Sequence, residues 1–228
     1  MSERNQHGQP LGRLVETLLP RPLPDHRVLA GRHVTLVPLS VDHAQGLFQC
    51  FSDPAGWTYL GDEEPFASPE QARDWTASRA TSRDPLFYTV LQNDRPMGFC
   101  SFLRINPAHG VIEIGYIHFS PSLQGSAATT ETQYLMMRHA FDDLGYRRYE
   151  WKCNALNAPS RRAALRLGFT FEGIFRQAQV NKGRNRDTAW YSILDHEWPA
   201  QKARFEAWLD PANFDTQGQQ LRRLSDRR

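Results

Sequence analysis

The chain has 228 residues, of which 40% are hydrophobic and 23% are charged. That length fits one domain with additional segments, and the apolar content supports a sizeable core, which excludes a wholly disordered chain. The formal net charge is only +2, so no global field selects nucleic acid or anionic lipid as a partner.

The three cysteines, Cys50, Cys100 and Cys153, lie far apart and lack the close spacing of a zinc site. An odd, dispersed set argues against a disulfide framework and favours a reducing, cytoplasmic location. No apolar run reaches the ~18 residues that a membrane helix needs, and residues 1–24 lack the apolar stretch of a signal peptide. These features exclude secreted, membrane-spanning and metal-stapled classes, so we expect no membrane partner and no metal.

The two ends of the chain differ from its middle in composition. Residues 1–24 are polar and contain four prolines, which predicts an arm around one short helical turn. Residues 25–200 show neither a repeat nor a low-complexity linker, so we expect one domain there. Over 201–228 we expect a helical, arginine-rich tail, with its last eight residues in solvent.

Changes of hydrophobic period predict the elements of the first half. Residues 32–39 are typical of a strand, Ser40 of a helix cap, and Ser68-Pro-Glu-Gln of the start of a second helix. The first helix should bury one face, made of Ala44, Leu47, Phe48 and Phe51. Three strands follow at 86–92, 96–105 and 111–119. Their connections are too short for a parallel crossover, so they should pair antiparallel.

The second half alternates helices and strands. Tyr134, Met137, Phe141 and Leu144 repeat at helical spacing ahead of Gly145. A strand should follow at 146–153, then a helix from Asn157 to Gly168, then two strands around a basic hairpin at 181–186, with 189–194 as the return. This order predicts an α/β (α+β) fold, with a mixed, mostly antiparallel central sheet of about seven strands flanked by four main helices.

Four local motifs occur in order on these elements: Glu113-Ile-Gly-Tyr, Gln124-Gly-Ser-Ala-Ala-Thr, Asn157-x-x-Ser160 and Leu167-Gly-Phe-Thr-Phe-Glu-Gly. Together they resemble the GNAT superfamily of N-acetyltransferases, and most closely its branch of ribosomal-protein N-terminal acetyltransferases. The resemblance runs from about Leu29 to about Trp198. It implies a GNAT-like fold and transfer of an acetyl group from acetyl-CoA to an amine.

A loop of small residues precedes the long helix and comprises Gln124, Gly125, Ser126, Ala127, Ala128 and Thr129. Backbone N–H groups and the dipole at such a helix start attract anions, and the resemblance implies that this loop holds the pyrophosphate of acetyl-CoA. Ala127 and Thr129 stand where the family usually has glycine. Both are small enough for close approach, although a positive φ there would be costly. The alternative is an ordinary helix N-terminus packed under a strand.

The resemblance also implies that the pantetheine arm enters between the fourth and fifth strands. There the backbone of Ile117, His118 and Phe119 would pair with the cofactor, and one N–H would polarise the thioester carbonyl, an effect worth ~3 kcal/mol when preorganised. Asn157 would contact the cofactor, and Ser160 would bind and protonate the leaving thiolate. The alternative is that both residues only satisfy the helix backbone. The helix has no tyrosine, the acid of many superfamily members, which favours Ser160.

The general base is less defined. Ribosomal-protein relatives carry a carboxylate where this chain has Gln179, and an amide cannot take a proton. The candidates are Glu113, acting through water, and His118, whose ordinary pKa is near ~6.5. Glu113 could instead be a paired strand carboxylate and His118 a surface ring. Glu172 is expected to turn the chain rather than to do chemistry.

We expect the acceptor pocket between the first two helices and the last hairpin. It would be lined by Trp57, Tyr59 and Phe66, with Arg184 and Arg186 at its rim, although the aromatics could equally be core.

These features favour as acceptor a protein N-terminal α-amine or a small-molecule amine of low pKa. The alternatives are an acyl-CoA-binding protein of the same fold without turnover, or a ribosome- or RNA-associated factor that uses Arg184, Arg186 and the terminal arginines. The balanced charge argues against nucleic acid as the main partner. A homodimer remains open.

Overall fold

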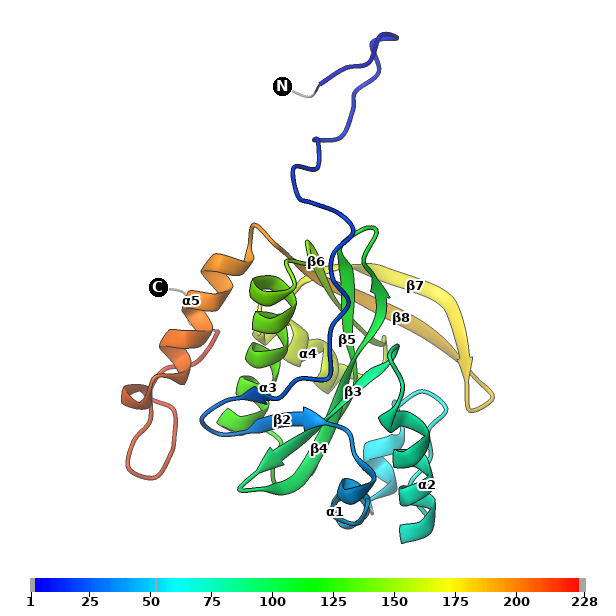
Figure 1. Cartoon of the computed structure of the whole chain (residues 1–228), viewed down its shortest axis with the longest axis vertical. Helices are drawn as coiled ribbons and strands as arrows, with labels where there is room; N and C mark the ends of the chain where they lie inside the picture. Colours follow the sequence, from blue (N-terminus) through cyan, green and yellow to red (C-terminus); the bar gives the residue numbers. More distant parts are fainter. Residues whose placement is uncertain (1–2, 52, 226–228) are drawn as a thin grey trace.

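The protein, described by a computed structural model over residues 3–51 and 53–225, forms an eight-stranded sheet within these ranges (Figure 1). The spatial order is β1-β2-β3-β4-β5-β6-β8-β7. All neighbours pair antiparallel except β5 and β6, which are parallel. The strands are β1 Leu29–Ala30, β2 Thr35–Pro38, β3 Leu86–Gln92, β4 Arg95–Asn106, β5 Val111–Phe119, β6 Arg148–Asn154, β7 Thr170–Asn181 and β8 Arg184–Leu194. The predicted fold class is confirmed, with eight strands rather than about seven.

Five α-helices occur in the described ranges: α1 Ala44–Cys50, α2 Pro69–Ala80, α3 Ala127–Arg138, α4 Ala158–Arg166 and α5 Trp198–Leu209. The predicted cap of α2 is confirmed, because Ser68 Oγ accepts a hydrogen bond from Gln71 N. The predicted cap of α4 is confirmed too, since Asn157 Oδ1 accepts from Ser160 N. α3 continues into a π-helical turn, His139–Asp143, and the chain then turns at Gly145 with φ +67.

Two strand boundaries differ most from the sequence prediction, and smaller differences occur at others, such as the start of β6 at Arg148 instead of 146. Of the first predicted strand, 32–39, only four residues form β2, because the chain turns back at 31–34 so that β2 can pair with β1. The last strand starts at Arg184 instead of 189. Lys182 and Gly183, with φ of +49 and +70, make a two-residue turn that lets Asn181 pair directly with Arg184.

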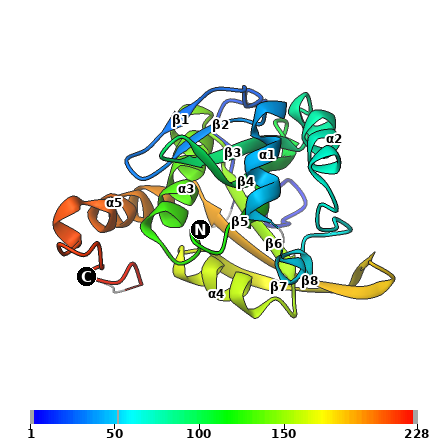
Figure 2. The ribbon, with the colours of Figure 1, turned by 90° about the horizontal axis from the view of Figure 1, so that it is seen from below.

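The sheet separates two apolar clusters, and Figure 2 shows α1 and α2 on one side of it and α3, α4 and α5 on the other. The larger cluster joins Ile112 and Ile114 of β5 to the buried faces of α3 and α5. The smaller cluster joins Phe87 and Phe99 to α1 and α2. Over β5 to β8, α3, α4 and α5 therefore bury one face of the sheet. The opposite face carries charged and polar residues together with the aromatic Trp190 and Phe175.

The N-terminal arm contains no helix within residues 3–24, so the predicted helical turn is wrong. Leu14 and Leu18 are 80% and 84% exposed, and a single turn without packing cannot offset the cost of helix nucleation. In Figure 1 the arm runs upward, away from the body of the molecule.

The C-terminal segment is partly packed. Trp198, Phe205, Trp208 and Leu224 are buried in the larger cluster, so residue 224 departs from the expected solvated end, while 226–228 lie outside the described residues. The domain boundaries at 25 and 200 stay a prediction. No helix in the described ranges is long and apolar enough to cross a membrane.

Candidate active site

β5 and β6 diverge halfway along their length. Their parallel pairing runs from Val111 with Arg148 to Ile114 with Trp151 and then stops, while β5 stays paired with β4 as far as Phe119. A bulge helps to turn β5 away: Gly115 and His118 pair two residues apart on β4, and Tyr116 has φ +48. The backbone of Ile117, His118 and Phe119 thus lies in the diverging part of β5, where a ligand could pair with it.

The helix start after β5 lacks the side-chain cap that α2 and α4 have. Ser126 is the N-cap of α3 but makes no side-chain cap hydrogen bond. Its Oγ donates to Leu123 O at 2.6 Å instead, and Thr129 Oγ1 donates to Ser126 O at 2.9 Å. Gln124 Nε2 donates to Phe119 O at 3.0 Å, which ties the loop to the end of β5. The first-turn N–H groups of α3 are thus not occupied by their own cap, as an anion site requires.

The backbone strain considered for this loop does not arise at its alanine or threonine. Gly125 has the positive φ, +73, whereas Ala127, Ala128 and Thr129 lie within α3. Ala127 is half-buried and Gly125 exposed. Ala127 and Thr129 therefore replace the usual glycines without adopting a left-handed backbone conformation. A pyrophosphate group fits the chemistry of this helix start.

Ser160 lies in the first turn of α4, beside the diverging end of β6. Its Oγ accepts a hydrogen bond from Trp151 Nε1 at 3.0 Å, so its own proton can be donated elsewhere. Asn157 Oδ1 accepts from Ser160 N at 3.1 Å, so Asn157 acts as a cap. Its contact with a cofactor stays a prediction. Burial raises the pKa of the nearby Cys153 thiol, and a hydrogen bond with Ser160 acts in the opposite direction.

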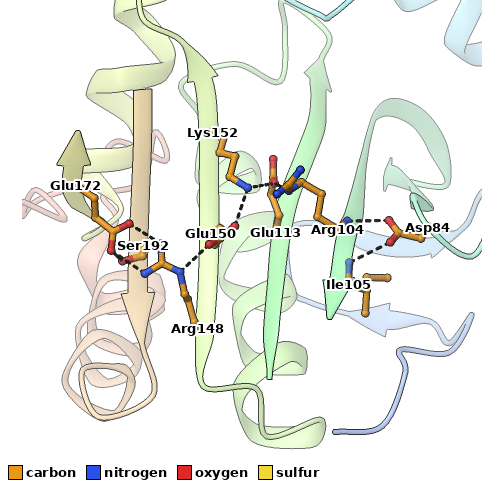
Figure 3. Close-up of polar contacts among 9 residues, drawn as sticks. All are labelled: Asp84, Arg104, Ile105, Glu113, Arg148, Glu150, Lys152, Glu172 and Ser192. Atoms are coloured by element: carbon orange, nitrogen blue, oxygen red, sulfur yellow. Dashed lines mark hydrogen bonds and ion pairs between the residues drawn. The ribbon is translucent and has the colours of Figure 1, made fainter. Parts of the chain in front are cut away.

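Glu113 is the paired strand carboxylate that the sequence left open as the alternative. It is buried, and its Oε2 lies 2.7 Å from Lys152 Nζ and 3.3 Å from Arg104 Nε (Figure 3). Burial raises its pKa, and Lys152 and Arg104 act in the opposite direction. Burial outweighs the two cations, so the net pKa of Glu113 is raised. The ion pairs nevertheless occupy Oε2, and the side chain is only 7% exposed, which limits its contact with an acceptor amine. Sequence reasoning missed Lys152 and Arg104, and the only available signal was the alternation of charged residues on neighbouring strands.

His118 is buried, so the alternative of a surface ring is wrong. Its ring centroid lies 4.0 Å from that of Phe51, 4.8 Å from that of Trp57 and 5.5 Å from that of Phe99. This burial lowers the pKa of His118 to about 4. The imidazole is therefore neutral at pH 7 and is a weak base.

The aromatic residues expected around the acceptor are mostly core. Trp57 has no exposed surface, and its indole N–H donates to Phe51 O at 3.2 Å. Phe66 is buried against Trp57, with ring centroids 4.9 Å apart. Neither can line an open pocket, because the loop between α1 and α2 folds inward over His118. Tyr59 is 40% exposed and stays a candidate.

The β7–β8 hairpin does reach the α1–α2 loop, as the acceptor prediction requires. Lys182 N donates to Asp62 Oδ1 at 2.8 Å, and Lys182 Nζ donates to Trp57 O at 3.0 Å. Arg184 is exposed at the hairpin tip, and Arg186 is half-buried with its guanidinium donating to Asn181 Oδ1.

Two further residues of the sequence analysis lie on the edge strand. Gln179 of β7 is exposed and pairs with Arg186. Glu172 lies within β7 at a register shift between Phe171 and Gly173, forms an ion pair with Arg148 and accepts a hydrogen bond from Ser192. That it does no chemistry stays a prediction.

Comparison with known proteins identifies the fold and the family. A family model described as an acetyltransferase (GNAT) domain matches residues 33–170. A crystal structure of a GCN5-related N-acetyltransferase from Brucella melitensis is 47% identical, covers 92% of this chain and 97% of its own, and has a TM-score of 0.89.

More distant relatives are also named or described as acetyltransferases. An uncharacterized N-acetyltransferase, p20, of Bacillus licheniformis is 29% identical over 75% of this chain and 97% of its own. The ribosomal-protein-serine acetyltransferase of Escherichia coli is 31% identical over 48% of this chain and 62% of its own. RimL, a ribosomal L7/L12 alpha-N-protein acetyltransferase solved with coenzyme A, shares the fold at 23% identity over 74% of this chain and 99% of its own, with a TM-score of 0.65. The chain belongs to the GNAT family and is an N-acetyltransferase.

Proposed function

We propose that the protein transfers the acetyl group of acetyl-CoA to a primary amine by direct attack in a ternary complex. The observation that carries this proposal is the end of β5–β6 pairing at Ile114 and Trp151. It opens the sheet beside two helix starts, the uncapped one of α3 and that of α4 with the Ser160 hydroxyl. Bound acetyl-CoA supplies an activated acetyl group and a thiolate leaving group.

Each part of the site has a distinct role in this proposal. The N–H groups at the start of α3 bind the pyrophosphate. A backbone N–H in the diverging part of β5, at 117–119, stabilises the oxyanion that forms on the thioester. Ser160 donates its proton to the leaving thiolate, since its oxygen is already an acceptor for Trp151. The proton that the attacking nitrogen loses restores the Ser160 hydroxyl, so the products are the acetylated amine and the thiol of coenzyme A.

The site offers little base strength, which selects the acceptor. His118 has its pKa lowered to about 4. Burial raises the pKa of Glu113, but its Oε2 is occupied by Lys152 and Arg104 and its side chain is only 7% exposed, so an acceptor amine has little access to it. A lysine amine at ~10.4 is only about one part in a thousand neutral at pH 7.4, a handicap of ~4 kcal/mol. An α-amine at ~7.8 loses less than ~1 kcal/mol. We therefore infer an α-amino group, or a small-molecule amine of low pKa, as the acceptor.

A protein N-terminus is the favoured form of that acceptor. The Escherichia coli relative is named for acetylating a ribosomal protein, and RimL is described as an alpha-N-protein acetyltransferase. Three dispersed free cysteines support a cytoplasmic location.

The test combines binding and turnover. Calorimetry should show that coenzyme A binds, and acetyl-CoA should then acetylate an α-amine peptide faster than its Nα-blocked, lysine-containing twin at pH 7.4. Equal or faster acetylation of the lysine twin contradicts the acceptor assignment. Binding without acetylation of either peptide or of a panel of small amines would instead indicate an acyl-CoA-binding protein.

A further inference from the structure

A ladder of charged residues crosses the open face of the sheet, the face opposite α3, α4 and α5 (Figure 3). It contains Arg104, Glu113, Lys152, Glu150, Arg148 and Glu172, and each is ion-paired with the next. The side chains of Glu113 and Lys152 are each 7% exposed, whereas that of Arg104 is 63% exposed. The ladder therefore presents a cation to solvent at its Arg104 end.

Arg104 reaches this face because its backbone departs from a regular strand. Phe102 lies in the buried cluster on the other face, and regular alternation would send Arg104 to the same side. Instead the register shifts after Leu103, and Arg104 adopts φ +48, a region that non-glycine residues rarely occupy. Strained residues of this kind cluster at functional sites.

Asp84 holds Arg104 in that conformation. Its carboxylate accepts from Arg104 N at 2.8 Å and from Ile105 N at 3.1 Å (Figure 3). Asp84 comes from the turn before β3, and Figure 3 shows it on the side of Arg104 away from Glu113. Asp84 is therefore a positioning residue: it fixes the backbone whose side chain crosses to the open face.

Hydrogen-bond donors on β8 accompany this cation. Lys152 pairs with Trp190 and Asn154 with Thr188, so Trp190, Thr188 and Arg186 alternate onto the open face. Trp190 Nε1, Thr188 Oγ1 and Arg186 Nε are buried, with no hydrogen-bond partner among the described residues. Thr188 is only 5% exposed. Buried polar groups are normally paired, so unpaired ones here point to a ligand.

One of these donors, Trp190, lies close to the exposed cation. The Arg104 guanidinium lies 5.8 Å from the Trp190 ring centroid, and Lys152 Nζ lies 3.6 Å from it. Arg186 interacts electrostatically with Glu113, the ion-pair partner of Arg104. The neighbouring carboxylates, Glu113 and Glu150, are already paired with cations. A ligand complementary to the Arg104 cation and the donors on β8 is therefore an anion that accepts hydrogen bonds.

We propose that this open face binds an anionic group of the acetyl acceptor, a carboxylate or a phosphate, with Arg104 as the specificity-determining cation and Arg186, Thr188 and Trp190 as accompanying donors. The proposal rests on the proposed function. Glu113 and Ile117 are four residues apart on β5, or ~13 Å in a regular strand, and the bulge shortens this span. The anion thus binds roughly 10 Å from the reacting nitrogen, which is the reach of the third side chain of an extended peptide.

The experiment compares three peptide amides with a free α-amine: Ser-Ala-Glu-Ala, Ser-Ala-phosphoserine-Ala and Ser-Ala-Gln-Ala. Release of coenzyme A measures kcat/KM with the full chain. We expect one or both anionic peptides to exceed the glutamine peptide at least about tenfold. Which of them is faster distinguishes carboxylate from phosphate.

Variants assign the effect to Arg104. Arg104→Gln should reduce the anionic-to-neutral ratio to about one, and Asp84→Ala should lower the same ratio by releasing the backbone. Arg73→Gln, an exposed arginine on α2, is the matched control and should leave the ratio unchanged. A merely structural role of Asp84 would lower the melting temperature without moving the ratio.

Equal rates for the three peptides in the wild type overturn the proposal, and so does a ratio that survives Arg104→Gln. The wild-type comparison needs no variant, so it decides even where a variant fails to fold. Failure of all three peptides in a protein that acetylates another α-amine also overturns it. Loss of coenzyme A binding, or binding without acetylation of any amine, would contradict the proposed function instead.

Discussion

The indole N–H of Trp151 donates to Ser160 Oγ at 3.0 Å and so joins β6 to the first turn of α4. Trp151 is the last residue of β6 that pairs with β5. The hydroxyl is therefore held where the two strands begin to diverge. Because its oxygen already accepts a hydrogen bond, its proton is directed away from Trp151.

Ser160→Ala tests this arrangement. If Ser160 protonates the leaving thiolate, the variant should lose about 10²-fold in kcat, the usual size of such an acid's contribution. The dissociation constant for acetyl-CoA, measured by calorimetry, should change little. Ser78→Ala on α2 serves as the control. A weakened affinity with unchanged kcat would reduce Ser160 to a binding or capping residue.

Ala127→Glu tests the anion site at the start of α3. A carboxylate at this half-buried position would repel the pyrophosphate and occupy the helix N–H groups itself. We expect about 10²-fold weaker binding of coenzyme A in calorimetry. Ala207→Glu, at an exposed position of α5, should bind as the wild type does. Equal affinity of both variants would mean that the site is elsewhere.

Local signals predicted the elements that local forces determine. β3 and β5 lie at the predicted residues, because alternation and short turns act over a few positions. The caps of α2 and α4 are local for the same reason.

The missed contacts depend on residues far apart in the sequence. Asp84 and Arg104 are 20 residues apart, and Glu131 and Val34 are 97 apart. Their pairing follows from strand order and helix placement, which no periodicity encodes. The burial of Trp57 and His118 was missed for the same reason, since it depends on how the α1–α2 loop folds over β5.

Glu131→Gln tests one such long-range contact. The buried Glu131 carboxylate on α3 accepts from the backbone N–H groups of Arg32, His33 and Val34 at 2.8, 2.6 and 2.9 Å, and so holds the β1–β2 turn. An amide would direct its own N–H groups at these donors. We expect a loss of ~2–4 kcal/mol in the free energy of unfolding, measured in urea.

The control for this loss is Glu70→Gln, at an exposed position in the first turn of α2. Its loss should be clearly smaller than that of Glu131→Gln. Similar losses in the two variants would show that the three hydrogen bonds to Glu131 contribute no particular stability.

The buried imidazole of His118 should make the fold sensitive to acid. Its pKa is lowered to about 4 in the folded protein, against ~6.5 in the unfolded chain. Between these values the unfolded state binds a proton that the folded state does not, so stability rises with pH through this window. At pH 5 the contribution of His118 should make the free energy of unfolding about 2 kcal/mol lower than at pH 7.

His118→Phe keeps an aromatic ring among Phe51, Trp57 and Phe99 and should remove that part of the pH dependence. Urea unfolding at pH 5 and pH 7 measures it, with the exposed His196→Gln as the control. An unchanged difference between the two pH values in His118→Phe would show that His118 is not the group that titrates.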